Sequence, residues 1–314
     1  MNDFDVICLG DATIDIFLPL DSDNQNYKLN ETEISFDLGD KFLADGYKLF
    51  LGGIASNVAV GLSRLGKKVA LVTELGEDEL SETILKKLKS ENVSTELIKI
   101  NGKAQTTLSV IIMSQKKHIL FDAHNLKEHQ FNLENSNSSW LFIAGLGEKW
   151  KETYESALNF TEAKNIKIAF APGTNQVQEG KDKIAKVLDK TEIVFVNKTE
   201  AQIILEETGN IENLLKSFKS LGPKNVVITD GTNGSYALDS DSNFFHQEIV
   251  ASETVETTGA GDAYAAAFFA AFISNKPIQE CMRWGALNSS SVIEHIGAQE
   301  GLLTLEEMEK KLNG

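Results

Sequence analysis

The most informative segment of this 314-residue chain is Glu256-Thr257-Thr258-Gly259-Ala260-Gly261-Asp262, which leads into an alanine-rich, almost wholly apolar run at residues 263–272. The apolar run predicts a buried helix. Small residues leave the first N–H groups of a helix open, and the helix dipole adds positive potential, so the turn predicts an anion hole. A carboxylate at its mouth can take the proton of an attacking hydroxyl. Plain N-capping by Thr258 or Asp262 is the alternative.

Short apolar strands alternate with amphipathic helices along most of the chain. Continuous apolar runs lie at 6–9, 69–72, 140–143, 166–170, 193–196 and 226–229. Helical patterns lie at 54–65, 78–90, 150–164, 180–188, 198–207, 211–220 and 278–294. This alternation predicts an α/β fold with a mainly parallel central sheet and crossover helices.

Residues 14–51 and 104–122 break this rhythm, because they show strand-like alternation with no helix between the strands. We predict that these two segments, called the lid below, form a small antiparallel sheet that projects from the main body. The large α/β domain then comprises residues 1–13, 52–103 and 123–314. Exposed lid edges invite pairing between protomers, so a homodimer through the lid is expected.

Two junctions in the first part of the chain carry candidate binding residues. Gly52 and Gly53 let a polyhydroxy ligand lie against the backbone, and Asn57, one turn later, can donate to and accept from a sugar hydroxyl. Asp15 follows the first strand, where a carboxylate can accept two hydrogen bonds from a vicinal diol. The alternatives are a tight turn with Ser56 as N-cap, and a plain turn residue at Asp15.

Two more junctions suit a nucleotide. Asn197 and Glu200 stand where a strand ends and a helix begins, and Glu200 can order water bound to magnesium, which prefers indirect carboxylate contact. Asn-x-x-Glu is equally a capping box. Gly231 and Gly234 make a turn over which a nucleotide can lie, with Thr229 bonded to phosphate; a bare hairpin turn toward a strand at 235–238 is the alternative.

Charge and composition exclude other functions. The net charge is −16, which disfavours nucleic acid and membrane surfaces as partners. No apolar run approaches the roughly 20 residues of a membrane helix. Cys8 and Cys281 are too far apart for a disulfide framework, and the first residues have no basic leader, so we expect a cytoplasmic protein.

Three partial motifs do not indicate sites. Residues 61–68 resemble a P-loop, but Lys68 stands where Ser or Thr would hold magnesium, and a helix precedes the segment. Residues 145–147 lack the third glycine of a dinucleotide fingerprint. His124 and His129 do not share a helix face, so they are interpreted as ordinary histidines and not as metal ligands.

The glycine pair with Asn57 and the turn ending at Asp262 resemble the two signatures of the ribokinase-like sugar kinase family, of the phosphofructokinase B type. Residues 197–200 and 229–234 resemble further segments of that family in the same order. The resemblance implies a three-layer α/β/α domain with a mainly parallel central sheet and a small β-sheet lid. It also implies transfer of the γ-phosphoryl group of ATP, with Mg²⁺, to a hydroxyl of a sugar or nucleoside.

The resemblance assigns roles to the candidate residues. Asp262 would be the catalytic base, and the anion hole would be formed by Gly259, Ala260 and Gly261. The acceptor would be held by Asp15, Gly52, Gly53 and Asn57. The nucleotide and, through water, its magnesium would be held by Asn197, Glu200, Thr229, Gly231 and Gly234.

The chain departs from the family pattern at three places. Glu256 replaces an Asp linked to a monovalent-cation site, which leaves activation by such a cation open. Ala171, before Pro172, is not the polar residue often found there, so no acceptor contact is assigned to it. Asn288 is out of register with the family's adenine-side asparagine and is not carried over.

A neutral sugar is the expected acceptor. Phosphosugar kinases need fixed positive charge near the distal phosphate, and the only arginines, Arg64 and Arg283, lie on helices expected to face away from the acceptor. A phosphosugar would need the lysines Lys41, Lys48 or Lys103.

Two alternatives to a sugar kinase stay open. A nucleoside kinase would stack the base on a lid aromatic residue, with Phe17, Phe36 and Phe42 as candidates that equally suit the lid core. A non-catalytic sugar- or nucleotide-binding module is a different class of protein, and the intact turn with Asp262 argues against it.

Overall fold

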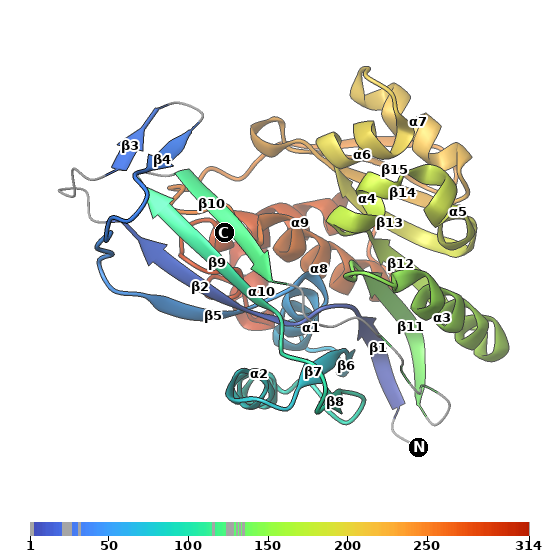
Figure 1. The fold of residues 1–314 in the computed structure, drawn as a ribbon. Helices are drawn as coiled ribbons and strands as arrows, with labels where there is room; N and C mark the ends of the chain where they lie inside the picture. Colours follow the sequence, from blue (N-terminus) through green and yellow to red (C-terminus); the bar gives the residue numbers. More distant parts are fainter. Residues whose placement is uncertain are drawn as a thin grey trace.

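The computed structural model describes residues 3–20, 27–30, 33–114, 117–123, 129, 131, 133 and 136–313. Its central sheet has the strand order β16-β15-β14-β13-β12-β11-β1-β6 (Figure 1). These strands are β1 (Asp3–Leu9), β6 (Val69–Val72), β11 (Asn137–Ala144), β12 (Lys167–Ala171), β13 (Thr191–Asn197), β14 (Asn225–Thr229), β15 (Ser235–Leu238) and β16 (Phe244–Gln247). The strands from β6 to β14 are parallel, and β15 and β16 pair antiparallel at one edge. The predicted mainly parallel sheet is confirmed.

Helices cover both faces of this sheet, which explains why its strands are apolar along their whole length. One face packs against α1 (Ile54–Arg64), α2 (Glu79–Ser90), α8 (Ala260–Ile273), α9 (Ile278–Val292) and α10 (Leu305–Asn313). The other packs against α3 (Trp150–Lys164), α4 (Thr174–Glu179), α5 (Lys181–Lys190), α6 (Lys198–Leu205) and α7 (Ile211–Ser220). After its first turn, helix α8 is apolar on almost every side, and it is buried between α1 and α9. No helix of the described residues is long and apolar enough to span a membrane.

A separate sheet stands beside the main body and has the order β10-β9-β2-β5 (Figure 1). Its strands are β2 (Thr13–Pro19), β5 (Lys48–Gly52), β9 (Leu108–Ser114) and β10 (Lys117–Ala123), and β3 (Tyr27–Leu29) pairs with β4 (Ile34–Phe36) nearby. The prediction of an antiparallel lid is wrong for one pair, because β2 and β9 run parallel. Both strands leave the main body in the same direction. The predicted domain boundaries stay a prediction.

Sequence patterns missed several short elements. Besides α4, α10 and the β3–β4 hairpin, these include β7 (Glu74–Gly76) and β8 (Lys99–Asn101), which pair in parallel. Apart from α10, which has nine residues, each is too short to show a hydrophobic period. The lid residues 21–26, 31–32 and 115–116 and the predicted ordinary residue His124 lie outside the described residues.

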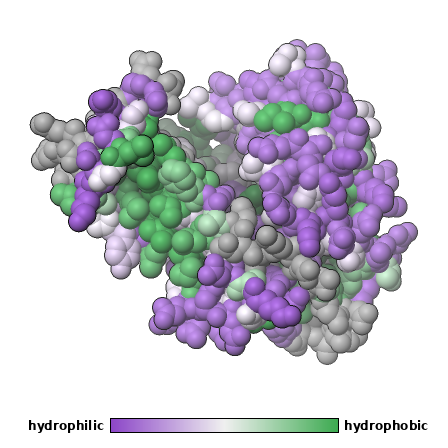
Figure 2. Space-filling view, in the orientation of Figure 1, coloured by the Kyte–Doolittle hydropathy of each residue, from purple (hydrophilic) through white to green (hydrophobic). Residues whose placement is uncertain are grey.

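The two faces of the lid sheet differ in chemistry. Strand register places Asp15 beside Ser109, and Ser109 beside Asp122, on one face. The opposite face, called the lid outer face below, carries Ile16, Leu18, Leu49, Val110, Ile112, Ile119 and Phe121. Figure 2 shows hydrophobic residues gathered over the lid, and Leu49 and Phe121 are 48% and 54% exposed. The lid therefore presents an apolar surface to its surroundings.

Candidate active site

The base candidate and the acceptor candidates lie together where α1, α8 and the lid meet. The Nδ2 group of Asn57, on α1, donates to Oδ2 of Asp262, on α8, at 2.8 Å. Asp15, at the start of the lid, is buried and lies close enough to Asp262 for their charges to interact. Gly52 lies directly against the Asp15 carboxylate, since a Cβ atom on Gly52 would overlap it.

The backbone at the start of α8 forms the predicted open turn with one correction. Gly259 is the N-cap, with a left-handed φ of 80°, and a Cβ atom there would overlap Ala298. The N–H of Ala260 is not open, because it donates to the carbonyl of Thr257 at 3.2 Å. The first intrahelical bond runs from Ala263 N to Gly259 O at 2.8 Å. The N–H groups of Gly261 and Asp262 precede that bond and are the ones free of the helix ladder.

Side-chain capping does not explain either junction. The N-cap of α8 makes no side-chain capping bond, so the capping role proposed for Thr258 or Asp262 is wrong. Thr258 instead donates its N–H and hydroxyl to Glu256 Oε1, at 2.8 and 2.7 Å. Ser56 is not the N-cap of α1 either, because that helix begins at Ile54 with Gly53 before it.

Burial raises the pKa values of the carboxyl groups in this site. The pKa of Asp262 is raised to about 6, mainly by burial, while the hydrogen bond from Asn57 opposes the rise. The pKa of Asp15 is also raised to about 6 by burial, and that of Glu200 to about 7 by burial and by the charge of Asp262. Asp262 is nonetheless partly exposed to the cleft. Its carboxylate can therefore be reached from the cleft.

The nucleotide candidates lie next to the base. A cavity of about 90 Å³ is lined by residues that include Asn197, Glu200, Thr229, Gly261 and Asp262. Asn197 and Thr229 are register partners at the ends of β13 and β14, which is why two distant segments reach one point. The structure thus brings this part of the predicted set together with Asp262.

The alternative interpretations of these segments are also realised in the fold. Asn197 and Glu200 form a reciprocal capping box, with two bonds of 2.8 Å. Residues 231–233 form a 3₁₀ turn in a hairpin between β14 and β15. These structural roles do not compete with binding, because Glu200 and Gly231 each line a cavity.

A larger cavity of about 510 Å³ shares Thr229, Gly261 and Tyr264 with the small one and is also lined by Gly231 and Gly234. Its other walls include residues 249–252, 254 and 257 and part of α9. A Cβ atom on Gly231 or Gly261 would meet nothing within 4 Å, so both positions border open space. A roomy, mainly apolar cavity that ends in open N–H groups fits a nucleotide with its phosphates toward Asp262.

The donor set also fits magnesium held mainly by water and phosphate. Within the described ranges, no three His, Cys, Asp or Glu side chains are grouped as metal ligands. Mg²⁺ uses one or two carboxylates and keeps several waters. Glu200, facing the small cavity, suits this indirect contact.

Some residues at the site could not be found from sequence motifs. Gln299 is buried and donates from Nε2 to Oδ1 of Asn57 at 2.9 Å. Residues 249–252 and 254 line the larger cavity, yet they form neither a helix nor a strand and carry no motif. Asn288, which was not assigned to the nucleotide, is fully buried and bonds to Ala263 O and Leu303 N.

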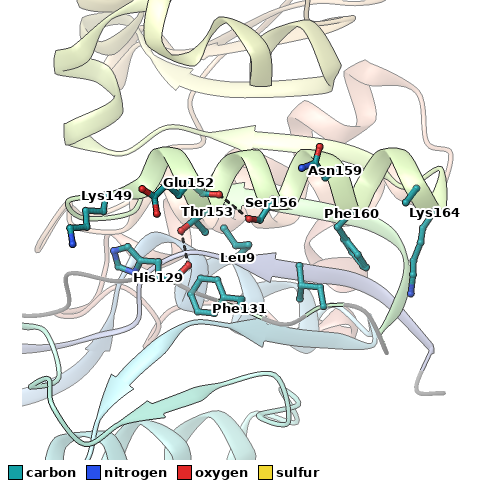
Figure 3. Close-up of a pocket in the computed structure, with 13 residues that line it drawn as sticks. Leu9, His129, Phe131, Lys149, Glu152, Thr153, Ser156, Asn159, Phe160 and Lys164 are labelled. Atoms are coloured by element: carbon teal, nitrogen blue, oxygen red, sulfur yellow. Dashed lines mark hydrogen bonds between the residues drawn. The ribbon is translucent and has the colours of Figure 1, made fainter.

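A third cavity, of about 800 Å³, lies along α3 (Figure 3). It is lined in part by His129, Phe131 and Thr153, and the Thr153 hydroxyl donates to the His129 carbonyl at 2.6 Å. This cavity is on the face of the sheet opposite α8, and none of the predicted site residues lines it.

Comparison with known proteins gives consistent results. The model of the family described as pfkB family carbohydrate kinase matches residues 6–305. An ATP-dependent 6-phosphofructokinase of Thermoanaerobacterium thermosaccharolyticum is 24% identical, over 94% of this chain and 89% of that relative. A nucleoside kinase of Methanocaldococcus jannaschii is 26% identical, over 84% of this chain and 85% of that relative.

Solved structures show the same fold. The Arabidopsis thaliana ribokinase complexed with ribose and ATP superposes with a TM-score of 0.83 at 19% identity, covering 100% of both chains. A ribokinase-family protein of E. coli in complex with ATP and Mg²⁺ gives a TM-score of 0.82 at 17% identity, covering 99% of both chains. The three-layer fold with a small separate sheet is thus shared with these proteins.

Proposed function

Because the chain belongs to the pfkB family of carbohydrate kinases, we propose that it transfers the γ-phosphoryl group of ATP to a hydroxyl of a small neutral sugar, with Asp262 as the general base. That it is a sugar or nucleoside kinase follows from the family. One observation carries the finer assignment. Asp262 is the carboxylate that borders the acceptor residues, the open N–H groups and the nucleotide cavity at once.

The chain's residues divide the chemistry as follows. Asp15 and Asn57 orient the acceptor so that one hydroxyl faces Asp262. Asp262 removes the proton of that hydroxyl as its oxygen attacks phosphorus, and the bond from phosphorus to the bridging oxygen of ADP breaks. The N–H groups of Gly261 and Asp262 stabilise the charge that gathers on the transferred group.

The nucleotide residues support this step from the other side. Thr229, Gly231 and Gly234 border the cavity that receives ATP, and Asn197 holds Glu200 at the edge of the smaller cavity. Bound magnesium supplies charge neutralisation for the phosphates. Nothing in this proposal depends on a monovalent cation, and the Glu256 carboxylate bonds to Thr258 in the turn.

A neutral acceptor is supported by the charges around the site. Asp15, Asp122 and Asp262 gather there, and the charges of both Asp122 and Asp262 raise the pKa of Asp15. Arg64 is bound to Glu91 and to backbone carbonyls, and Arg283 bonds to Leu312 O on α10. Three carboxylates without an arginine repel a phosphorylated acceptor.

The alternatives each have one specific observation. A phosphosugar is favoured by Lys48, which is opposite Phe17 and shares the lid face of Asp15. A nucleoside is favoured by the lid aromatic residues, but Phe17 is buried against Phe50 at a ring distance of 5.4 Å. Phe36 and Phe42 pack on each other at 4.8 Å. Phe17 is therefore lid core, whereas Phe36 and Phe42 are half-buried and keep part of their rings exposed.

The test is ATP turnover with Mg²⁺ against a panel of neutral sugars, phosphosugars and nucleosides, with Asp262→Asn measured beside the native protein. We expect neutral sugars to turn over and the variant to lose about two to four orders of magnitude. If only phosphosugars support turnover, the acceptor is a phosphosugar and not a neutral sugar. If no acceptor supports ATP turnover while the protein still binds ATP, a non-catalytic binding module is favoured.

The lid outer face suits a second copy of the chain. Its apolar side chains come from every strand of the lid sheet, Leu49 and Phe121 among them are exposed, and exposed apolar patches mark interaction sites. A two-fold axis would place the same face of a partner against it, burying both. We therefore include a lid-mediated homodimer in the proposal.

A further inference from the structure

We propose that Gln299 is a positioning residue, which fixes the orientation of the Asn57 amide so that Asn57 donates a hydrogen bond to Asp262. The inference rests on the proposed function, in which Asp262 is the base. Gln299 follows α9 in the chain, distant in sequence from the motifs that carry the other roles, and lies beside α1 in the fold.

The donor and acceptor groups fix the direction of both hydrogen bonds, from Gln299 to Asn57 and from Asn57 to Asp262. An ionised carboxylate only accepts hydrogen bonds, so the NH₂ group of Asn57 must face Asp262, at 2.8 Å. The Asn57 oxygen then faces Gln299, whose NH₂ group donates to it at 2.9 Å. If the Asn57 amide turned over, it would place oxygen against carboxylate and NH₂ against NH₂.

The other end of Gln299 shows what its side chain is placed to do. Gln299 is 2% exposed, and its Oε1 atom is buried with no hydrogen-bond partner in the part of the chain that the structure describes. A buried amide oxygen without a donor is costly. The hydrogen bond to Asn57 is therefore the polar contact that fixes the orientation of the Gln299 amide.

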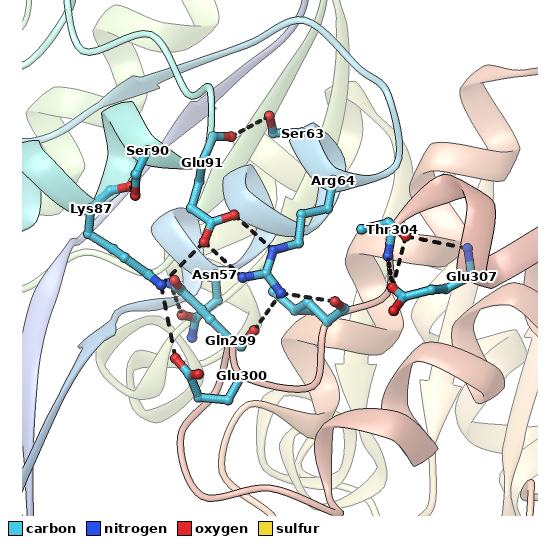
Figure 4. A network of polar contacts seen from close by, with 11 residues as sticks. Asn57, Ser63, Arg64, Lys87, Ser90, Glu91, Gln299, Glu300, Thr304 and Glu307 are labelled. Atoms are coloured by element: carbon cyan, nitrogen blue, oxygen red, sulfur yellow. Dashed lines mark hydrogen bonds and ion pairs between the residues drawn. The ribbon is translucent and has the colours of Figure 1, made fainter.

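Arg64 holds the backbone that carries Gln299 (Figure 4). Its Nη1 donates to the carbonyls of Gln299 and Leu302, both at 2.9 Å. Its Nε and Nη2 form a bidentate pair with Glu91 at the end of α2, at 2.8 Å each. Arg64 lies two turns beyond Asn57 on α1, so one helix carries both the amide and the arginine that anchors its partner.

This arrangement acts on the proton affinity of the base. The bond from Asn57 opposes the rise in the Asp262 pKa that burial causes. The titratable groups that face Asp262 from neighbouring elements are Asp15 of β2 and Glu200 of α6. Substituting Gln299 leaves both in place. Without the contact to Gln299, the Asn57 amide can rotate by half a turn. In the rotated orientation its NH₂ group no longer donates to Asp262, and the charged carboxylate loses a stabilising hydrogen bond.

The experiment follows the carboxyl ¹³C resonance of Asp262 through a pH titration of aspartate-labelled protein. Asp262→Asn identifies the resonance, because that variant lacks it. In Gln299→Met, which keeps the length of the side chain, we expect the midpoint to rise by about 0.5 to 1 pH unit. Gln299→Glu gives a second variant of native shape. Its carboxylate accepts from Asn57 and turns the amide over, so we expect a larger rise.

Gln176→Met is the matched control. Gln176, on α4, is also fully buried, but its Nε2 donates to the carbonyl of Leu146 at 2.9 Å and not to Asn57. We expect this variant to melt earlier and to leave the Asp262 midpoint unchanged. An unchanged midpoint in both folded Gln299 variants overturns the inference.

Failure of the proposed function gives a different result. If Asp262→Asn keeps native turnover, Asp262 is not the base, whatever the titration shows. If Asp262→Asn is inactive and the titration midpoint of Asp262 is unchanged in the Gln299 variants, Asp262 is the base and Gln299 does not position Asn57. When Asp262 is the base and Gln299 positions Asn57, turnover by Gln299→Met should depend on pH in a matching way. The loss of turnover at low pH should shift to higher pH by the same amount as the titration midpoint of Asp262.

Discussion

Replacing Asp262 with Asn is expected to stabilise the protein while it removes activity. Burial raises the pKa of Asp262 from 3.8 to about 6. A shift of about two units corresponds to about 3 kcal/mol between the folded and unfolded states. Because the group opens to the cleft, solvent reduces this, and we expect a gain of about 1–3 kcal/mol in the free energy of unfolding. For a chain of this length the melting temperature should rise by roughly 2–6 °C.

The sign of the pH dependence follows from linkage. The folded state binds the Asp262 proton more tightly than the unfolded state, so the native protein loses stability as pH rises from about 4 to about 6. The gain of the Asn variant should therefore be small at pH 4, grow up to about pH 6, and stay constant at higher pH. Asn57 can still donate to the amide oxygen of the variant, so no hydrogen bond is lost.

The assay is thermal unfolding of both proteins at several pH values between 4 and 8, with turnover measured on the same samples. Asp37→Asn serves as the control, because Asp37 is an exposed lid aspartate and its substitution should leave the melting temperature unchanged. A gain that is equal at pH 4 and pH 8 would refute the reasoning from proton binding. A variant that is less stable at pH 8 would show that the buried charge does not cost stability.

Three further predictions concern other parts of the molecule. Gly261→Ala should keep the native melting temperature but raise the KM for ATP about tenfold, since its methyl group enters open space at the nucleotide cavity. Gly259→Ala should instead lose about 1–3 kcal/mol of stability in a denaturant titration, because this residue has a positive φ and its new Cβ atom would overlap Ala298. Glu200→Gln should shift the Mg²⁺ dependence of turnover to about tenfold higher concentration, and an unchanged Mg²⁺ titration would remove Glu200 from the metal's surroundings. Replacing Leu49 and Phe121 together with Asp should yield monomers in sedimentation, whereas a native protein that is already monomeric at micromolar concentration would exclude the lid-mediated dimer.

Much of the site follows from where polar residues stand in the sequence. Parallel strands end at a common edge, so polar residues after separate strands must meet there. Asn197 and Thr229 show this directly, since each ends its strand and the two are register partners. The apolar run after Asp262 likewise predicted a buried helix. The first turn of that helix lies at the same edge of the sheet, because it lines a cavity with Asn197 and Thr229. Local pattern and sheet geometry were sufficient for these residues.

Other features depend on contacts that no local pattern encodes. The N–H of Ala260 is taken up by Thr257, which depends on the conformation of the turn and not on its composition. Gln299 reaches Asn57 only because α1 and the segment after α9 lie side by side in the folded chain. The parallel pairing of β2 and β9 was missed because alternation of side chains is the same in parallel and antiparallel strands.

The parallel pair in the lid has a consequence for how the protein is made. Ile14 pairs with Leu108, so β2 leaves the ribosome long before its central neighbour exists. Until β9 emerges, only β5 can pair with β2, and their apolar side chains face the crowded surroundings of the nascent chain. Non-local pairing of this kind is slow and leaves strands open to aggregation. The apolar side chains of β2 should therefore stay accessible to chaperones until β9 has been synthesised.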